Sequence, residues 1–413
     1  MKSTTHIVVV SQVFAPDTQS TSQLLSELVR RTAGGGARIT VVTGQTATID
    51  GVFPPRFEVQ GEVQIRRTGI AANYKKSLLR RAMHYLAYIV GVAIELWRVR
   101  DADTVLGVTN PPFIPIVLWG LKKIYVRRYD LMLQDIYPEG LVAIGRLKAS
   151  GLTARIWSSL NYRAYAGADR IVVLGRDMKA LVQREYHVAP EKIVYLPHWS
   201  VVPPLNIVEK RNTKVAEQLG IKEKFVVQYS GNMGIWHDVI SIVRCAERLR
   251  ETEDIHFLFI GDGVGKRLAM QLANEKHIAN ISWLPFQSQE DLRDSLSCCD
   301  VALISQRAGL TGVAVPCKIY GIMAVGRAVL AMVPTGSEID LVISEERCGL
   351  VVSPGNVDGL AAAILALKAN PSGRAEMAAN GFRACTARYT LAAAVMKYRE
   401  FWKLDKTGEA TAC

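Results

Sequence analysis

Lys318 is the residue of this chain best placed to do chemistry on an anion. It lies in the segment Gly309-Leu-Thr-Gly-Val-Ala-Val-Pro-Cys-Lys-Ile-Tyr-Gly-Ile-Met-Ala-Val-Gly326. The pattern predicts a flexible loop, a helix that starts near Lys318, and a stop at Gly326. Such a loop directs backbone N–H groups and an ammonium to one place, which suits a diphosphate. The alternative is a surface lysine beside a capped helix.

A glycine cluster follows a predicted strand in the same half of the chain. Gly231, Asn232 and Gly234 come directly after the β-rich residues 225–229. Backbone without side chains can approach phosphate oxygens closely, and we expect a helix N-terminus next to it. An ordinary strand-to-helix turn is the alternative interpretation.

A second cluster, Gly261 and Gly263, also follows a predicted strand and precedes a predicted helix. Its spacing is GxGxG, and the next predicted strand, residues 281–284, ends in Pro285-Phe286 without an acid to hold a ribose. A dinucleotide-dependent dehydrogenase is therefore disfavoured, and a tight turn is the simpler interpretation of these glycines.

Two acids follow a predicted strand of the first half, residues 129–134. Asp135 and Glu139 would lie at the carboxyl end of that strand, the edge where open α/β sheets bind ligands. Either could orient or deprotonate a hydroxyl group. The alternatives are a helix cap for Asp135 and a first-turn helix acid for Glu139.

The scaffold for these residues alternates short β-rich runs with helical patterns. This alternation predicts an α/β fold with parallel sheets. The predicted strands of the first half are residues 6–12, 39–43, 63–68, 104–108, 129–134 and 170–174. Those of the second half are residues 225–229, 256–260, 281–284, 301–305, 328–332 and 349–352.

A chain of 413 residues exceeds the size at which one hydrophobic core keeps growing, so two domains are expected. A proline-rich stretch, residues 196–212, interrupts the alternation and is the predicted linker. We place the domains at residues 1–200 and 201–385, and a terminal helix within residues 386–405.

The formal charge of +12 attracts anions. Basic residues cluster in pairs within the first third, which favours a patterned surface over a nucleic-acid-binding arm. The seven cysteines form no CxxC pair and have no histidine at metal-ligand spacing. This pattern indicates reduced thiols and no metal site. The first apolar run, residues 7–10, is too short for a signal-peptide core, so we expect a cytoplasmic protein.

Residues 82–99 are apolar enough that a membrane-spanning helix has to be considered. His84, Tyr88, Glu95 and Arg98 interrupt it at helical intervals, which makes it too polar on one face to span a bilayer. The complementary apolar stripe is Leu79, Met83, Leu86, Val90, Ala93 and Trp97. We expect a domain helix that packs this stripe on a sheet, and a helix lying on a membrane surface is the alternative.

The segment that carries Lys318 resembles the donor-site loop and helix of glycosyltransferase family 4 enzymes with the GT-B fold. The similarity is to the bacterial surface-polysaccharide branch, which includes colanic acid and O-antigen fucosamine transferases. Further matches follow in order over roughly residues 6–390, and their joint order is more specific than any single motif. They are Phe14-Ala-Pro16 with Ser20-Thr21, Gln134-Asp-Ile-Tyr-Pro-Glu139, Tyr229-Ser-Gly-Asn-Met-Gly234, Phe259-Ile-Gly-Asp-Gly263 and Gly349-Leu-Val-Val-Ser-Pro-Gly355.

The resemblance implies two Rossmann-like domains facing across a cleft, with the acceptor on the N-terminal domain and the donor on the C-terminal one. The last helix would cross back to the N-terminal domain. Neither a metal nor a cofactor is expected, and the donor is expected to be a UDP-sugar. The implied catalytic residues are Asp135, Glu139 and Lys318. The implied donor-binding residues are Gly231, Asn232, Gly234, Gly261, Gly263, Phe286, Gly312, Val313, Lys318 and Tyr320.

The chain departs from the family pattern at several of these positions. Val313 and Gly321 stand where two glutamates are usual, and Gln134 stands where a histidine is usual. Asn232 and His237 replace an arginine and a lysine. Lys318 is therefore expected to be the main cation beside the departing nucleoside diphosphate.

These observations predict a glycosyltransferase of bacterial surface-polysaccharide synthesis, for O-antigen or exopolysaccharide. The sugar would be a fucosamine or another N-acetylated amino sugar, and the acceptor a saccharide or a polyprenyl-diphosphate-linked saccharide. We expect no nucleic-acid partner. We do expect peripheral binding to an anionic membrane through Lys75, Lys76, Arg80, Arg81 and the adjoining helix. A nucleotide-sugar epimerase of the same fold and a binding subunit without turnover are the alternatives.

Overall fold

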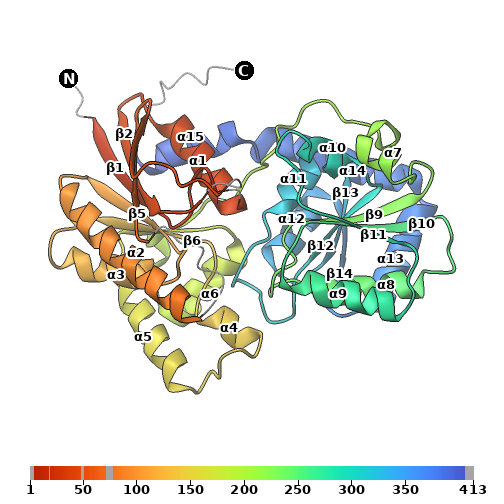
Figure 1. Cartoon of the computed structure of the whole chain (residues 1–413), viewed down its shortest axis with the longest axis horizontal. Helices are drawn as coiled ribbons and strands as arrows, with labels where there is room; N and C mark the ends of the chain where they lie inside the picture. The colour runs from red at the N-terminus through yellow and green to blue at the C-terminus, as the bar shows by residue number, and fades with distance from the viewer. Residues whose placement is uncertain (1–3, 18, 48–50, 71–77, 405–413) are drawn as a thin grey trace. The chain divides into compact units, whose positions relative to one another are not determined.

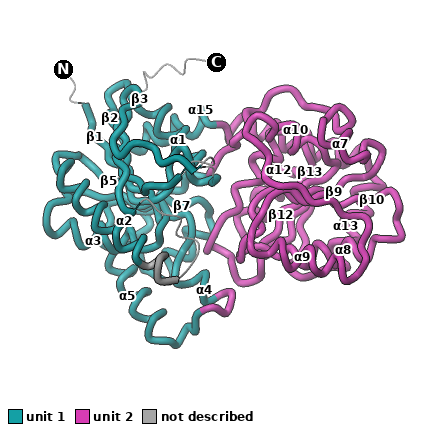
Figure 2. The backbone as a smooth tube through the Cα atoms, viewed as in Figure 1, with its two compact units in different colours: residues 1–142, 147–197, 391–413 teal, residues 143–146, 198–390 magenta. Residues whose placement is uncertain are grey.

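The chain folds into two compact units, which Figure 2 colours separately. The computed structural model describes residues 4–17, 19–47, 51–70 and 78–404, without the side chains of residues 78–82. Unit 1 contains residues 1–142, 147–197 and 391–413, and unit 2 contains residues 143–146 and 198–390. Apart from the short segment 143–146, the chain leaves unit 1 after Pro197 and returns to it at Leu391.

Unit 1 is built on an eight-stranded sheet in the order β3-β4-β2-β1-β5-β6-β7-β8 (Figure 1). All neighbouring strands are parallel except β3 and β4. The strands are β1 (Thr5–Val10), β2 (Ala37–Gly44), β3 (Phe57–Gln60), β4 (Val63–Thr68), β5 (Thr104–Val108), β6 (Tyr129–Leu133), β7 (Arg170–Val173) and β8 (Ile193–Tyr195). β5 and β6 are buried throughout and are mostly apolar, as central parallel strands are; their polar residues are Thr104 and Asp130.

The helices of unit 1 cover both faces of this sheet. α2 and α3 contact each other, as do α3 and α5, and α1 contacts α15. The helices are α1 (Ser20–Thr32), α2 (Leu78–Arg98), α3 (Ile114–Lys122), α4 (Glu139–Ala143), α5 (Leu152–Gly167), α6 (Arg176–Tyr186) and α15 (Leu391–Phe401), with a 3₁₀ turn at Pro190–Lys192. Arg399 of α15 donates hydrogen bonds to the carbonyls of Thr32, Gly34 and Gly35 at the end of α1, which fixes α15 in this unit.

Unit 2 is built on a six-stranded parallel sheet in the order β11-β10-β9-β12-β13-β14. The strands are β9 (Phe225–Ser230), β10 (Ile255–Ile260), β11 (Ile281–Leu284), β12 (Val301–Ser305), β13 (Ala328–Met332) and β14 (Gly349–Val352). The helices are α7 (Lys214–Gln218), α8 (Val239–Arg248), α9 (Val264–Glu275), α10 (Leu292–Ser297), α11 (Lys318–Ala324), α12 (Glu338–Glu346), α13 (Val357–Ala369) and α14 (Pro371–Arg388), with a 3₁₀ turn at Lys210–Asn212. The apolar faces of α8 and α13 pack on β9, β10 and β12 in one buried core.

Every predicted strand is present, and no strand end differs from its prediction by more than two residues. The sequence prediction missed β3 and β8. β3 has four residues at the sheet edge and pairs antiparallel with β4 across the turn at Gly61. β8 has only three residues. Strands this short carry too few side chains to show a periodic pattern.

The prediction for α2 was right about the helix and wrong about its face. The apolar stripe points to solvent, since Met83, Leu86, Val90 and Trp97 are between 52% and 64% exposed. The face that packs on the sheet instead carries His84, Tyr88, Val92 and Leu96, all nearly inaccessible. Leu79 belongs to the side chains outside the description.

The interrupting polar residues of α2 have partners on the sheet side, which explains the reversal. His84 contacts the Gln12 side chain at 3.3 Å, and Glu95 accepts a hydrogen bond from Arg66 of β4 at 3.2 Å. Gly91 lies directly against Thr68, where any side chain would collide. Over the part of the chain that the structure describes, no helix is long and apolar enough to cross a membrane.

Candidate functional site

The first candidate site lies in unit 2, at the point where the strand order of its sheet reverses. β9, β10 and β11 follow one another to one side of the sheet, whereas β12, β13 and β14 lie on the other side of β9. In open α/β sheets, ligands bind at the carboxyl ends of the strands beside such a reversal. The loops that leave this point are residues 231–238 after β9 and residues 306–317 after β12.

Lys318 brings a buried amine to this point. It is the first residue of α11, and its Nζ lies 3.8 Å from the centre of the Tyr229 ring, a cation–π contact. This Nζ is inaccessible to solvent and has no hydrogen-bond partner among the residues that the structure describes. Burial lowers the pKa of Lys318 to about 7. The alternative of a surface lysine is therefore wrong.

A neutral histidine stands beside the lysine. His237 Nδ1 lies 2.6 Å from the carbonyl oxygen of Ser305 and donates its proton to it, since a carbonyl can only accept. Burial, and secondarily the Lys318 charge, lowers the pKa of His237 to about 3. His237 therefore contributes no positive charge, and an incoming anion meets the ammonium of Lys318.

The glycine loop lets the chain approach the lysine closely. Gly231 has a φ of 125°, which favours glycine, and a side-chain carbon there would lie 3.3 Å from Lys318 Nζ. Asn232 is exposed, and Gly234 packs against its amide group. We predicted a helix N-terminus directly after this loop. The helix starts later, because α8 begins only at Val239, where Asp238 caps it.

Gly261 and Gly263 form the tight turn between β10 and α9. Their φ values are 128° and 145°, and a side chain at Gly261 would strike the backbone of Gly231 at 2.2 Å. The two glycine loops are thus in direct contact. Phe286 follows β11, reaches over Gly261 and is 57% exposed, so its ring is available to a flat ligand group at the same edge.

The remaining predicted donor residues are mostly internal. Gly312 has a φ of 75° and forms part of the loop before α11. The side chains of Val313 and Tyr320 are buried, and Tyr320 packs on Tyr389 at 4.8 Å between ring centres. In this conformation only the backbone of Val313 and Tyr320 could reach a ligand.

The sequence analysis missed two residues of this site. Tyr229 supplies the ring beneath Lys318, and Arg307 places an exposed guanidinium just after β12. Arg307 also ties the two loops together, because its backbone N–H donates to the carbonyl of Trp236. Both residues stand at the carboxyl end of a correctly predicted strand, and that position was the available signal.

Unit 1 carries the predicted acids at the corresponding edge of its own sheet. Asp135 follows β6, and Thr109 at the end of β5 holds its segment through hydrogen bonds with Gln134 N–H and the Asp135 carbonyl. Burial raises the pKa of Asp135 to about 6. A carboxyl with this pKa can accept a proton near neutral pH.

Glu139 has a structural partner. It is the first residue of α4, and one carboxyl oxygen accepts a hydrogen bond from the Tyr186 hydroxyl at 2.5 Å. Burial raises the pKa of Glu139, and its second carboxyl oxygen is buried without a partner among the described residues. Glu139 therefore holds α4 against α6 rather than facing solvent.

Aromatic rings lie near Asp135. Trp157 of α5 stacks between Phe113 and Tyr137, with ring centres 4.8 Å and 5.8 Å away. All three rings are half-buried. Burial is the main cause that raises the pKa of Tyr137, and the nearby charge of Asp135 raises it further. Within the described residues, no group of three His, Cys, Asp or Glu side chains could hold a metal ion.

This fold and these two edges define the GT-B class of glycosyltransferases. The family model for glycosyl transferases group 1 matches residues 211–384, and the model for the glycosyl transferase 4-like domain matches residues 21–199. Together they match most of the chain, which therefore has a glycosyl transferase 4-like domain followed by a glycosyl transferases group 1 domain and is a glycosyltransferase.

Two curated relatives agree with this class. The Pseudomonas aeruginosa protein WbjE, named as a glycosyltransferase, is 29% identical over 86% of this chain and 87% of its own length. The Escherichia coli protein WcaI, named as a colanic acid biosynthesis glycosyl transferase, is 24% identical over 87% of this chain and 91% of its own. An epimerase is therefore not favoured.

Solved structures agree on the fold. Sucrose-phosphate synthase of Thermosynechococcus elongatus has a TM-score of 0.78 at 15% identity and covers 97% of this chain and 98% of its own. The Anabaena protein HepE, solved in complex with UDP-glucose, has a TM-score of 0.69 at 14% identity and covers 96% and 99%. At these identities the likeness concerns the fold alone.

Proposed function

We propose that unit 2 binds a UDP-sugar and that Lys318 holds its diphosphate. The observation that carries this proposal is the buried Nζ of Lys318, which lacks a hydrogen-bond partner among the described residues and lies at the strand-order reversal. A buried amine without an anion is costly, and an arriving diphosphate would remove that cost. The UDP-glucose in the HepE structure supports the choice of nucleotide.

In the proposed reaction, the bond between the sugar anomeric carbon and the diphosphate oxygen breaks as an acceptor hydroxyl attacks that carbon. The Asp135 carboxylate orients the hydroxyl and takes up its proton, which the pKa of about 6 permits. The Lys318 ammonium stabilises the negative charge on the departing UDP. Neither a metal nor a cofactor takes part in these steps.

We further propose that the acceptor is a lipid-linked saccharide of bacterial surface-polysaccharide synthesis, and the sugar an N-acetylated amino sugar. The name of WcaI, a colanic acid biosynthesis glycosyl transferase, supports the pathway. The stacked rings of Phe113, Trp157 and Tyr137 support the acceptor position, because half-buried rings bind the apolar faces of sugars and prenyl chains.

The test measures UDP release from UDP-N-acetylglucosamine and other UDP-sugars, with and without an extracted polyprenyl-diphosphate-linked saccharide. Transfer predicts release that depends on the acceptor and a product that contains the added sugar. A changed sugar without UDP release would indicate an epimerase. Donor binding without any acceptor-dependent product would indicate a binding subunit.

The exposed stripe of α2 supports a peripheral membrane location, which we also propose. Leu86, Val90 and Trp97 form one apolar face, and exposed apolar faces of this length usually mark an interaction surface. Arg98 and Arg100 lie at its C-terminal end, and the Arg100 guanidinium stacks on Trp97 at 4.8 Å. Lys75 and Lys76 lie outside the described residues, as do the side chains of Arg80 and Arg81.

Sedimentation with vesicles tests this location. Wild-type protein should bind vesicles that contain phosphatidylglycerol, weakly at high salt, and Leu86→Ser with Trp97→Ser should abolish binding without loss of stability. Equal binding by the double variant and the wild type would show that α2 does not contact the membrane. Leu365→Ser, at an exposed leucine of α13, is the matched control.

A further inference from the structure

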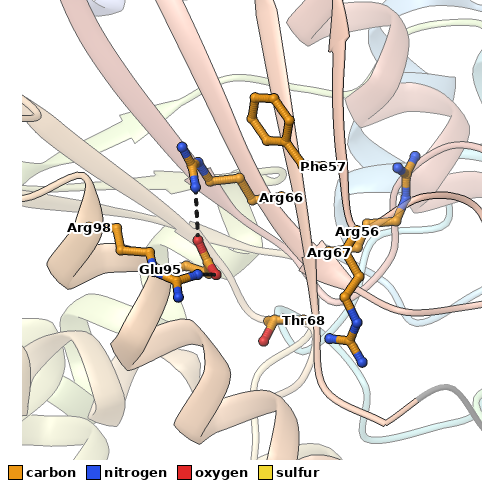
Figure 3. A pocket seen from close by; sticks show the side chains of 7 residues that line it. All are labelled: Arg56, Phe57, Arg66, Arg67, Thr68, Glu95 and Arg98. Carbon is orange, nitrogen blue, oxygen red and sulfur yellow. Dashed lines mark hydrogen bonds and ion pairs between the residues drawn. The ribbon is translucent and has the colours of Figure 1, made fainter.

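A pocket of about 360 Å³ lies beside α2 at the edge of the unit 1 sheet (Figure 3). Strands β3 and β4 form one wall and the C-terminal half of α2 forms the other. Four of its seven lining residues are arginines, and one is an acid. The lining residues are Arg56, Phe57, Arg66, Arg67, Thr68, Glu95 and Arg98.

Glu95 organises the pocket without neutralising it. Its carboxylate accepts hydrogen bonds from Arg66 at 3.2 Å and from Arg98 at 2.5 Å, as the dashed lines in Figure 3 show. Each guanidinium has five donor hydrogens, so most donors of both arginines remain for a ligand. Arg66 Nε is buried without a hydrogen-bond partner among the described residues. Paired guanidinium donors around a cavity suit a phosphate group.

Arg67 is bound by other protein groups and is not available to a ligand. It is 4% exposed, and its guanidinium donates to Glu58 at 2.7 Å and to the carbonyls of Pro55 and Ala15. These bonds fix the segment before β3 against β4. Arg56 stands opposite Arg67 across the two strands and points the same way, away from Arg66, Glu95 and Arg98 (Figure 3). The charges available to a ligand are therefore those of Arg66 and Arg98.

Exposed apolar side chains stand on both sides of the pocket. Phe57 and Val59 of β3 alternate onto one face and are 53% and 57% exposed, and Phe57 pairs with Arg66 across the strands. Because Arg66 reaches Glu95, this is the face that α2 covers. On the helix, Ile94 and Trp97 flank Glu95 and Arg98 in sequence and are exposed. A phosphate site between two apolar borders matches the chemistry of a phospholipid at a bilayer surface.

We propose that this pocket binds the phosphate of an anionic phospholipid headgroup while α2 and β3 lie on the membrane. The proposal rests on the membrane location proposed above and names the group that is recognised. The pocket is separate from the strand end that carries Asp135. Tyr85 lies near that strand end, because Tyr85 and Asp135 both raise the pKa of Tyr137 electrostatically. Glu95 lies ten residues further along α2 than Tyr85. At 1.5 Å per residue, this separation is about 15 Å.

The experiment compares vesicle binding by wild-type protein and by Arg98→Gln. Arg98 is exposed, and the change leaves the Arg66–Glu95 bond in place, so the fold should persist. The vesicles contain phosphatidylcholine with phosphatidylglycerol, or phosphatidylcholine with oleate at equal surface charge. We expect this variant to bind phosphatidylglycerol vesicles about fivefold more weakly, because each basic residue near the surface contributes about fivefold.

The matched control removes one exposed charge elsewhere, with Arg248→Gln of unit 2. It should change binding less than twofold. Glu95→Gln is the second variant: it should strengthen binding to phosphatidylglycerol if the pocket holds a phosphate, and weaken or not change it if Glu95 is only structural.

The outcomes separate the two proposals. Wild-type protein that ignores phosphatidylglycerol vesicles would overturn the membrane location and this pocket with it. Wild-type binding that Arg98→Gln does not reduce would overturn the pocket alone. Equal binding to oleate vesicles would also overturn it, as would complete competition by millimolar inorganic phosphate, which would assign the pocket to a free phosphate.

Discussion

The ammonium of Lys318 links the geometry of unit 2 to its chemistry. Its position over the Tyr229 ring partly compensates a buried charge, because the face of the ring is negative. Burial nevertheless brings the pKa down to about 7, so near neutral pH a large share of molecules carry an uncharged amine. A diphosphate at this point favours the charged form and should draw a proton into the site.

Replacing Lys318 with methionine should lower the affinity for UDP about tenfold to a hundredfold, because a hydrogen bond from a charged group contributes about 1.5–3 kcal/mol. Stability should hold or rise, since the change removes an unpaired buried cation. Isothermal titration calorimetry and thermal unfolding give the two quantities. Lys276→Met, at an exposed lysine of α9's C-terminal end, is the control, and UDP affinity equal to wild type in Lys318→Met would remove Lys318 from the site.

The affinity for UDP should fall as the pH rises from 7 to 9. The free site has a lowered lysine pKa of about 7, and the bound anion raises it, so the complex holds more protons over this window. Calorimetry in buffers of different ionisation heats should show proton uptake on binding at pH 8. A pH-independent affinity, or proton release, would contradict the buried-amine account.

Asp135→Asn should lower turnover while the affinity for UDP stays within about twofold. In wild-type protein the rate should rise with pH through about 6, because the carboxyl must lose its proton before it can act as a base. The variant should lose this limb of the pH profile. An unchanged pH limb in the variant would assign it to another group.

Helix α2 shows how an element can be predicted correctly and oriented wrongly. The helix has apolar residues on two faces, with Tyr88, Val92 and Leu96 on one and Leu86, Val90 and Trp97 on the other. Periodicity finds such a helix but does not choose its buried face. The choice depends on partners far away in sequence, such as Gln12 for His84 and Arg66 for Glu95.

Gly91→Ala should destabilise unit 1 by about 1–3 kcal/mol, because the added carbon would lie 1.8 Å from Thr68 Oγ1 and would push α2 away from β4. Leu86→Ala on the exposed face should change stability by less than about 0.5 kcal/mol. Urea unfolding of both variants measures this difference. A larger loss for Leu86→Ala than for Gly91→Ala would place the apolar stripe in the interior.

In the loops after β9 and β12, too, local patterns predicted the elements, and distant contacts decided how they meet. The strands, the glycine turns and the start of α11 at Lys318 follow from local patterns and are present. The burial of Lys318, the Tyr229 ring beneath it and the proton on His237 depend on contacts between β9, β12 and α11. Residues 89 positions apart meet there, and no local pattern encodes such a meeting.

On the scale of the whole molecule, the alternation of strands and helices was sufficient to predict two α/β sheets, both of which are present. The strand order was not predicted, although it creates the reversal beside β9 where the loops after β9 and β12 meet. The return of the chain to unit 1 depends on Arg399 and its three carbonyl partners at the end of α1. The bond from the Arg399 guanidinium to the carbonyl of Thr32, 367 residues away at the end of α1, is a tertiary contact with no local signal.

Hydrogen exchange with and without UDP tests most directly whether unit 2 carries the donor site at the β9 and β12 strand ends. Bound nucleotide should slow exchange in residues 231–238 and 306–318 of the wild-type protein, because binding stabilises the loops that it contacts. At the same UDP concentration, Lys318→Met should show little or no protection. Protection confined to unit 1, or equal protection of these loops in Lys318→Met, would contradict the account.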